Sequence, residues 1–147
     1  AYGIPWIITR PANIYGEGQQ DYRLIPKAIQ ALKDGEKIKL DGGGLSRRSF
    51  IHVKDACEAT YRIAKQGDVR STYHISTQRD VSIAELVQLL CKIAGKNFQS
   101  SVDNVPDRLG KDFAYLLKTD AIRRMGWRDT ISLERGLEDL WKQQHSA

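Results

Sequence analysis

Apolar residues follow two spacings along this chain: short continuous or alternating runs, and recurrences every three to four residues. The first run, at 4–8, is nearly continuous, which is typical of a strand buried on both faces. We therefore expect a strand over Ile4–Thr9, stopped by Arg10-Pro11 because proline has no amide hydrogen to donate to a ladder. Asn13 then follows the carboxyl end of the strand, where open α/β sheets bind their ligands.

Later segments show the helical spacing, each with a polar residue placed to cap its first turn. The predicted helices are 24 to about 34, 55 to about 66, 83–94, 120–125 and one that begins after 132. Their expected capping residues are Asp21, Asp55, Ser82, Asp120 and Ser132. Asp55 with Glu58 and Ser82 with Glu85 have the spacing of a capping box.

Short strand-like segments separate these helices. They are Ile38–Leu40, Ser49–Val53, Thr72–Ser76 and Phe113–Leu117, with Phe98–Val105 either irregular or a weak edge strand. The alternation of strands and helices predicts an α/β or α+β fold. A length of 147 residues with 41% apolar residues suits one domain with its own core.

Composition narrows the classes of function. The net charge is +5, with acidic residues interspersed among the basic ones, so no dense basic stripe predicts nucleic-acid binding. Cys57 and Cys91 both fall in helical apolar patterns, which predicts two buried free thiols and, by default, a cytoplasmic protein. There is no signal peptide and no run of 18 apolar residues, so we expect no membrane insertion. The three histidines lack metal-ligand spacing, so we expect no metal site.

Three segments carry candidate chemistry, and each also has a purely structural interpretation. Arg10 and Asn13 can meet a ligand at a strand end, or Asn13 can simply close a turn. The segment 42–48 joins three glycines to two arginines, which suits an anion but equally a hairpin turn. The segment 107–112 joins Arg108 and Lys111 to two aspartates, and it can also be merely a solvated loop. None is a dinucleotide or P-loop fingerprint.

Tyr61 and Lys65 match the Tyr-x-x-x-Lys pair with which short-chain dehydrogenases transfer protons. Residues four apart share one face of any helix, so chance matches are common. No glycine-rich loop precedes the pair, and we interpret it as an ordinary helix face.

The order of the weak motifs is more informative than any one of them. The chain reads R-P-x-N-x-Y-G, L-I-P, G-x-G-x-x-x-R, F-I-x-V-x-D-A, D-R-x-G-x-D and L-E-x-G-L from one end to the other. This series resembles the C-terminal half of the extended short-chain dehydrogenase/reductase family, the NAD-dependent nucleotide-sugar epimerases and dehydratases. Within that family, the enzymes that dehydrate dTDP-glucose at positions 4 and 6 are the most similar group.

The resemblance implies a set of substrate-binding residues. Asn13, Arg48 and Arg108 would contact the ligand diphosphate, while Arg23 and Leu24 would approach the nucleotide. His74 stands where the family usually has an asparagine, and Lys111 replaces a histidine near the phosphates. No catalytic residue and no metal ligand is expected on this chain.

The resemblance also implies an α/β fold: the C-terminal substrate-binding part of a Rossmann-type enzyme, with 1–10 and about 49–76 contributing to the sheet of a longer protein. The N-terminal half, with the NAD loop and the catalytic Tyr and Lys, would precede this chain. NAD would then be held by that half, and the isolated chain would be inactive. Expected partners are a nucleotide-diphosphate sugar, the missing half and further copies of the chain.

Three functions remain open on these grounds. The parent enzyme is a 4,6-dehydratase, or a 4-epimerase or reductase of the same family. Alternatively, the chain is a non-catalytic or regulatory module that binds nucleotide sugars. The sugar and the nucleotide base are left open as well.

Overall fold

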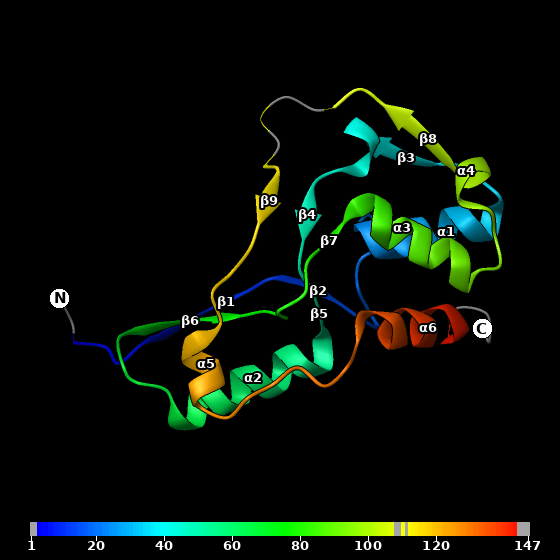
Figure 1. The fold of residues 1–147 in the computed structure, drawn as a ribbon. Helices are drawn as coiled ribbons and strands as arrows, with labels where there is room; N and C mark the ends of the chain where they lie inside the picture. Colours follow the sequence, from blue (N-terminus) through cyan, green and yellow to red (C-terminus); the bar gives the residue numbers. More distant parts are fainter. Residues whose placement is uncertain (1–2, 108–109, 111, 144–147) are drawn as a thin grey trace.

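The computed structural model describes residues 3–107, 110 and 112–143 as a mixed α/β fold of short strands and helices (Figure 1). The helices are α1 (Leu24–Asp34), α2 (Val53–Gln66), α3 (Ile83–Ile93), α4 (Phe98–Ser101), α5 (Asp120–Arg124) and α6 (Leu133–Gln143), with a 3-10 turn η1 (Gly42–Gly44). The strands are β1 (Ile7–Pro11), β2 (Asn13–Tyr15), β3 (Ile38–Asp41), β4 (Arg47–Arg48), β5 (Phe50–His52), β6 (Ser71–Ile75), β7 (Val81–Ser82), β8 (Val102–Val105) and β9 (Ala114–Tyr115).

The strands pair mostly in parallel, across long stretches of sequence. β1 pairs with β6, β2 with β5, and β3 with β8, each in parallel. β4 lies between β7, which is antiparallel to it, and β9, which is parallel. Parallel pairs require crossover connections, and here these contain the helices, as the predicted α/β class demands.

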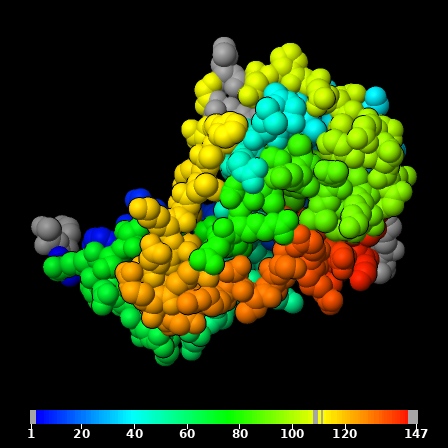
Figure 2. Space-filling model, in the orientation of Figure 1, coloured from blue at the N-terminus to red at the C-terminus, as the bar shows by residue number. Residues whose placement is uncertain are grey.

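Two hydrophobic clusters form the core, and they correspond to the two lobes visible in Figure 2. The larger packs α1, α3 and α6 around β3, with side chains that include Ile29, Leu86, Leu90 and Leu137. The smaller packs α2 and α5 against β1 and β6, around Trp127. β2 and β5 run between the lobes (Figure 1), so residues at their ends lie where the lobes meet.

The opening strand differs from its prediction in bounds and in burial. It begins at Ile7 and continues through Pro11. Ala12 donates its backbone N–H to Ile75 O (2.8 Å), so the nitrogen of Pro11 faces away from β6 and the ladder loses no bond. Ile8 is 43% exposed, so the strand is not buried on both faces in this chain.

The start of α2 is also corrected. The helix begins at Val53 with His52 as its N-cap, and His52 Nδ1 accepts from the Lys54 backbone N–H at 3.2 Å. The Asp55 carboxylate does not cap the helix. It instead accepts hydrogen bonds from the backbone N–H groups of Thr130 and Ile131, far along the chain.

Two of the other predicted N-caps, Ser82 and Ser132, are confirmed. Ser82 and Glu85 form the full capping box of α3, and Ser132 accepts from the Arg135 N–H at 3.2 Å. The predictions for Asp21 and Asp120 are wrong, because Arg23 and Thr119 are the N-caps of α1 and α5 and neither uses its side chain.

The remaining differences are local. The segment 98–105 divides into the helical turn α4 and strand β8. Cys91 is buried, but Cys57 is exposed, so only one of the two predicted buried thiols is found. None of the helices described is both long and apolar enough to cross a membrane.

Candidate functional site

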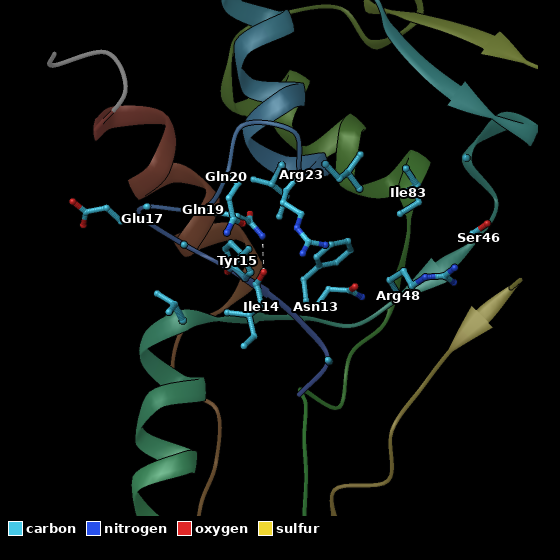
Figure 3. Close-up of a pocket in the computed structure, with 18 of the residues that line it drawn as sticks. Asn13, Ile14, Tyr15, Glu17, Gln19, Gln20, Arg23, Ser46, Arg48 and Ile83 are labelled. Atoms are coloured by element: carbon cyan, nitrogen blue, oxygen red, sulfur yellow. Dashed lines mark hydrogen bonds between the residues drawn. The ribbon is translucent and has the colours of Figure 1, made fainter. Parts of the chain in front are cut away.

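A cavity of about 710 Å³ lies between the lobes (Figure 3). Its walls come from β2 with the polar loop after it, the first turn of α1, β3, and the segment that leads from η1 through β4 to Phe50. Segments distant in sequence therefore surround one space, and both loops and strand ends contribute polar groups to it.

The structure brings together four of the seven residues implied by the resemblance. Asn13, Arg23, Leu24 and Arg48 all line the cavity. His74 lies in β6, paired in register with Arg10, and is not among the cavity-lining residues. Arg108 and Lys111 lie outside the residues that the structure describes.

Asn13 is fixed by the pairing of β2 with β5. Its backbone N–H and its side-chain Nδ2 both donate to Ser49 O, at 3.2 and 3.1 Å. These bonds hold the amide at the strand end, pointed along the cavity wall. The second Nδ2 hydrogen can then donate to a ligand oxygen.

Arg48, on the cavity wall, extends its guanidinium to the end of the D-R-L-G-K-D motif. Its Nη2 donates to Asp112 O at 2.8 Å, and its Nη1 donates to Arg47 O at 2.7 Å and to Phe113 O at 3.4 Å. All three acceptors are neutral backbone carbonyls, so the positive charge of the guanidinium is not offset by these bonds. It remains available to attract an anion.

Arg47 anchors the strand from which Arg48 projects. Its guanidinium bonds the Asp80 carboxylate, donates to Asp80 O at 3.1 Å and reaches Glu85 Oε2 at 3.4 Å. The hydrogen bond to Asp80 raises the pKa of Arg47, while the Ser82 backbone N–H lowers the pKa of Glu85. Because successive strand residues alternate in direction, Arg47 faces this acidic pair and Arg48 faces the cavity.

The first turn of α1 closes another side of the cavity. Arg23 is the N-cap, and its side chain makes no capping bond, so first-turn N–H groups have no side-chain partner at the N-cap. The helix N-terminus carries a partial positive charge, which favours a nearby anion. The Arg23 guanidinium lies 5.3 Å from the centre of the Tyr22 ring.

The glycine turn η1 holds the start of the 107–112 segment at the cavity rim. Gly42 has φ +57°, and a Cβ there would come within 2.6 Å of Asp107 Cγ. Only glycine allows this approach without displacing Asp107. Gly42 thus lies against Asp107 at the start of the 107–112 segment, and Arg48 contacts Asp112 at its end.

Several polar residues that line the cavity were not among the predicted site residues. They include Glu17 and Gln19 in the loop after β2, and Lys39 and Asp41 in β3. The alternation of apolar and polar residues over 38–41 could have identified Lys39 and Asp41, because it places both side chains on one face of the strand. Gln19 Nε2 donates to Ile14 O at 2.8 Å, while its Oε1 is buried with no partner in the part of the chain described.

Within the described residues, no group of three or more His, Cys, Asp or Glu side chains is arranged to hold a metal ion. The polar groups of the cavity are instead two guanidiniums, an ammonium, three side-chain amides, two hydroxyls, two carboxylates and a helix N-terminus. This set can bind a ligand with a negatively charged centre and hydrogen-bonding ends.

Comparison with known proteins identifies the family. A sequence profile described as the NAD dependent epimerase/dehydratase family matches residues 1–76, just over half of the chain. The chain therefore belongs to this family, and the resemblance inferred from the order of its motifs is confirmed.

Relatives and solved structures agree with that assignment. A mouse dTDP-D-glucose 4,6-dehydratase is 33% identical over 142 residues, which cover 93% of this chain and 40% of the relative. A dTDP-glucose 4,6-dehydratase from Streptomyces venezuelae, solved with NAD bound, superposes with a TM-score of 0.91 at 33% identity over 97% of this chain and 45% of that one. A UDP-glucose 4-epimerase from Thermotoga maritima, solved with UDP-glucose, gives a TM-score of 0.90 at 25% identity over 99% and 47%.

These structures are Rossmann-type enzymes, so the predicted fold class is confirmed. The chain spans less than half the length of each of the proteins compared above.

Proposed function

We propose that this chain is the nucleotide-sugar-binding part of an NAD-dependent 4,6-dehydratase. The observation that carries the proposal is the convergence of Asn13, Arg23 and Arg48 on one cavity from three different elements. A diphosphate has several anionic oxygens, which suit two guanidiniums, an amide and a helix N-terminus.

The proposed role of these residues is positioning. Arg48 and Asn13 hold the diphosphate through charge-assisted hydrogen bonds, and the first turn of α1 faces it with backbone N–H groups. Arg108 and Lys111 add cations from the 107–112 segment. With the diphosphate fixed, the sugar ring is held in one orientation for reaction.

In such an enzyme, bound NAD would supply hydride transfer at the sugar C4. The residues of this chain do not suit the dinucleotide, since its sequence has no G-x-G-x-x-G fingerprint. We therefore propose that NAD is bound by another part of a longer protein, and that this chain alone performs no step of the reaction.

Calorimetric titration tests the binding role. We expect the chain to bind dTDP-, UDP- or GDP-sugars, and Arg48→Ala and Arg108→Ala each to weaken binding about tenfold or more, because a hydrogen bond to a charged group contributes roughly 1.5–3 kcal/mol. Arg135→Ala is the matched control, because this exposed arginine pairs with Asp139 on α6. Equal affinities for all three variants, or no binding by the unsubstituted chain, would contradict the proposal.

A turnover assay tests the proposed inactivity. With NAD and dTDP-glucose supplied, the isolated chain should leave the sugar nucleotide unchanged. Consumption of dTDP-glucose, detected by chromatography, would show that catalytic groups are present here after all.

The second candidate is a nucleotide-sugar 4-epimerase, favoured by the superposition on the UDP-glucose 4-epimerase over nearly the whole chain. Binding does not separate the two, because both hold a nucleotide diphosphate. Product analysis of a longer protein that contains this chain does: a 4-keto-6-deoxy sugar identifies the dehydratase, and an inverted C4 the epimerase. A reading frame without an upstream glycine-rich loop and Tyr-x-x-x-Lys would instead favour a non-catalytic binding module.

A further inference from the structure

One wall of the cavity carries charges that a diphosphate site does not need. In β3, Ile38 and Leu40 are buried, while Lys39 is exposed and Asp41 half-buried. Strand residues two apart point to the same side, about 7 Å from each other. Lys39 and Asp41 both line the cavity, so an ammonium and a carboxylate lie side by side on this wall.

The carboxylate is the informative group. A diphosphate oxygen next to Asp41 would be repelled, because two neighbouring negative charges make binding less favourable. A carboxylate in the wall of an anion-binding cavity therefore suits a different part of the ligand, one that presents N–H or O–H donors. Lys39 beside it offers a donor to an acceptor on the same part.

The position of β3 indicates which part of the ligand this is. Glu17, after β2, lies on one side of the cavity in Figure 3, and Ser46 and Arg48 lie on the other. Asp41 immediately precedes η1, which leads into Ser46. If the reacting sugar lies at the carboxyl ends of the parallel strands β1 and β2, as ligands do in α/β sheets, then the nucleoside extends past the diphosphate toward β3.

The chemistry of the bases then discriminates among nucleotides. Guanine presents two adjacent donors, N1–H and the 2-amino group, beside the O6 acceptor, which matches a carboxylate next to an ammonium. Uracil and thymine present one N–H between two carbonyl oxygens, which would face the carboxylate unfavourably. Adenine and cytosine each have a single amino donor on this edge.

We propose that the β3 wall recognises the nucleotide base and that Asp41 and Lys39 select guanine, so that the ligand is a GDP-linked sugar. This inference rests on the proposed function and deepens it. A carboxylate has about four lone-pair sites, so Asp41 can accept from the base and from protein groups at once.

Titration of the 147-residue chain with GDP, IDP, UDP and dTDP tests this directly. GDP should bind most tightly. IDP, which lacks only the 2-amino group, should bind about tenfold more weakly, because one hydrogen bond to a charged acceptor is lost. Asp41→Asn should remove the difference between GDP and IDP, and Lys39→Met should weaken GDP several-fold.

The control is Asp103→Asn, which makes the same charge change on the neighbouring strand β8, opposite Lys39 in register but outside the cavity. It should leave the GDP/IDP ratio unchanged, with circular dichroism confirming that each variant is folded. Equal or tighter binding of UDP or dTDP, or equal loss of all four nucleotides in Asp41→Asn, overturns the guanine assignment alone. Failure of every nucleotide to bind overturns the proposed function with it.

Discussion

At the scale of single residues, Tyr15 links two motifs from opposite ends of the chain. Its side chain is almost wholly buried, its ring lies edge-on to His52 with centroids 5.3 Å apart, and its hydroxyl donates to Ser132 O at 3.5 Å. Burial, with nearby Asp55, raises the pKa of Tyr15 well above its ordinary value, so the hydroxyl stays protonated. A Cβ on Gly136 of α6 would come within 2.2 Å of that hydroxyl oxygen.

Gly136→Ala should therefore destabilise the protein by about 2 kcal/mol, because the added methyl overpacks the contact with Tyr15. A loss of stability would be diagnostic, because alanine normally stabilises a helix interior relative to glycine. Chemical denaturation measures the effect. Adding Tyr15→Phe should restore part of the loss by removing the nearest atom, whereas a Gly136→Ala variant as stable as the unsubstituted chain would contradict this packing.

His52 gives the fold a pH dependence. Burial lowers the pKa of this histidine, Lys54 lowers it further, and Asp55 partly opposes the shift. A base with a lowered folded pKa takes up protons more readily when unfolded, so its stabilisation is present above the unfolded pKa of about 6.5 and is lost as the pH falls below it. Protonation would also remove the Nδ1 acceptor that caps α2.

We expect the free energy of unfolding to fall between pH 7.5 and 5.5, and to fall less in His52→Asn. Asparagine also caps helices but does not titrate in this range, so its stability at pH 7.5 should differ by less than about 1 kcal/mol. Denaturant titrations of both proteins at pH 7.5 and 5.5 measure the pH dependence and the difference in stability. Identical pH dependence in the two proteins would show that His52 is not the titrating group responsible.

At the scale of elements, Asp55 joins α2 to the loop that leads into α6. Its buried carboxylate accepts from the Thr130 hydroxyl at 2.7 Å and from the backbone N–H groups of Thr130 and Ile131 at 3.0–3.2 Å. Without this group, those two amide hydrogens would lose their acceptor. Asp55 thereby links α2, in the smaller lobe, to the loop that enters α6, in the larger lobe.

Asp55→Ala should cost about 3 kcal/mol of stability, because it removes several hydrogen bonds to a charged group and leaves buried donors unpaired. Thr130→Val, which deletes only the hydroxyl, should cost about 1 kcal/mol. Thermal unfolding compares them with Asp120→Asn, an exposed control. Similar melting temperatures for Asp55→Ala and the control would mean that this connection contributes little.

Asp55 also shows which local features could be predicted from the sequence and which could not. The α3 capping box was predictable because Ser82 and Glu85 lie within one turn of each other. Asp55 has the same local pattern, yet its partners are 75 and 76 positions away, and those contacts replace the capping role. Local rules hold where both partners are local, and tertiary contacts decide the remainder.

At the scale of the whole molecule, the sequence predicted some of the cavity's polar groups and missed others. Asn13 and Arg48 belonged to separate weak signals until the order of motifs connected them, and Arg23 was implied by the resemblance alone. Lys39 and Asp41 were overlooked, because alternation in a strand shows only that one face is polar, not what that face meets. The cavity forms only when β2, β3 and β4 come together, and β2 and β4 are more than thirty residues apart in the sequence.

The first strand also leaves an apolar surface open. Ile4 and Trp6, just before β1, and Ile8, within it, are 65, 44 and 43% exposed, and the only described strand paired with β1 is β6. A β-strand with an open edge and apolar side chains tends to pair with another chain. We propose that this face is covered by another part of a longer protein or, when the chain is alone, by a second copy.

Sedimentation over a wide concentration range should therefore detect self-association of the isolated chain, and Ile8→Lys should weaken it because a charge would have to be buried at the contact. Leu116→Lys is the matched control, since Leu116 is 56% exposed but lies beyond β9, outside this face. Equal weakening by both variants would assign the association to general apolar exposure. A chain that stays monomeric at every concentration, with the amides of β1 protected from hydrogen exchange, would mean that pairing with β6 alone satisfies this strand.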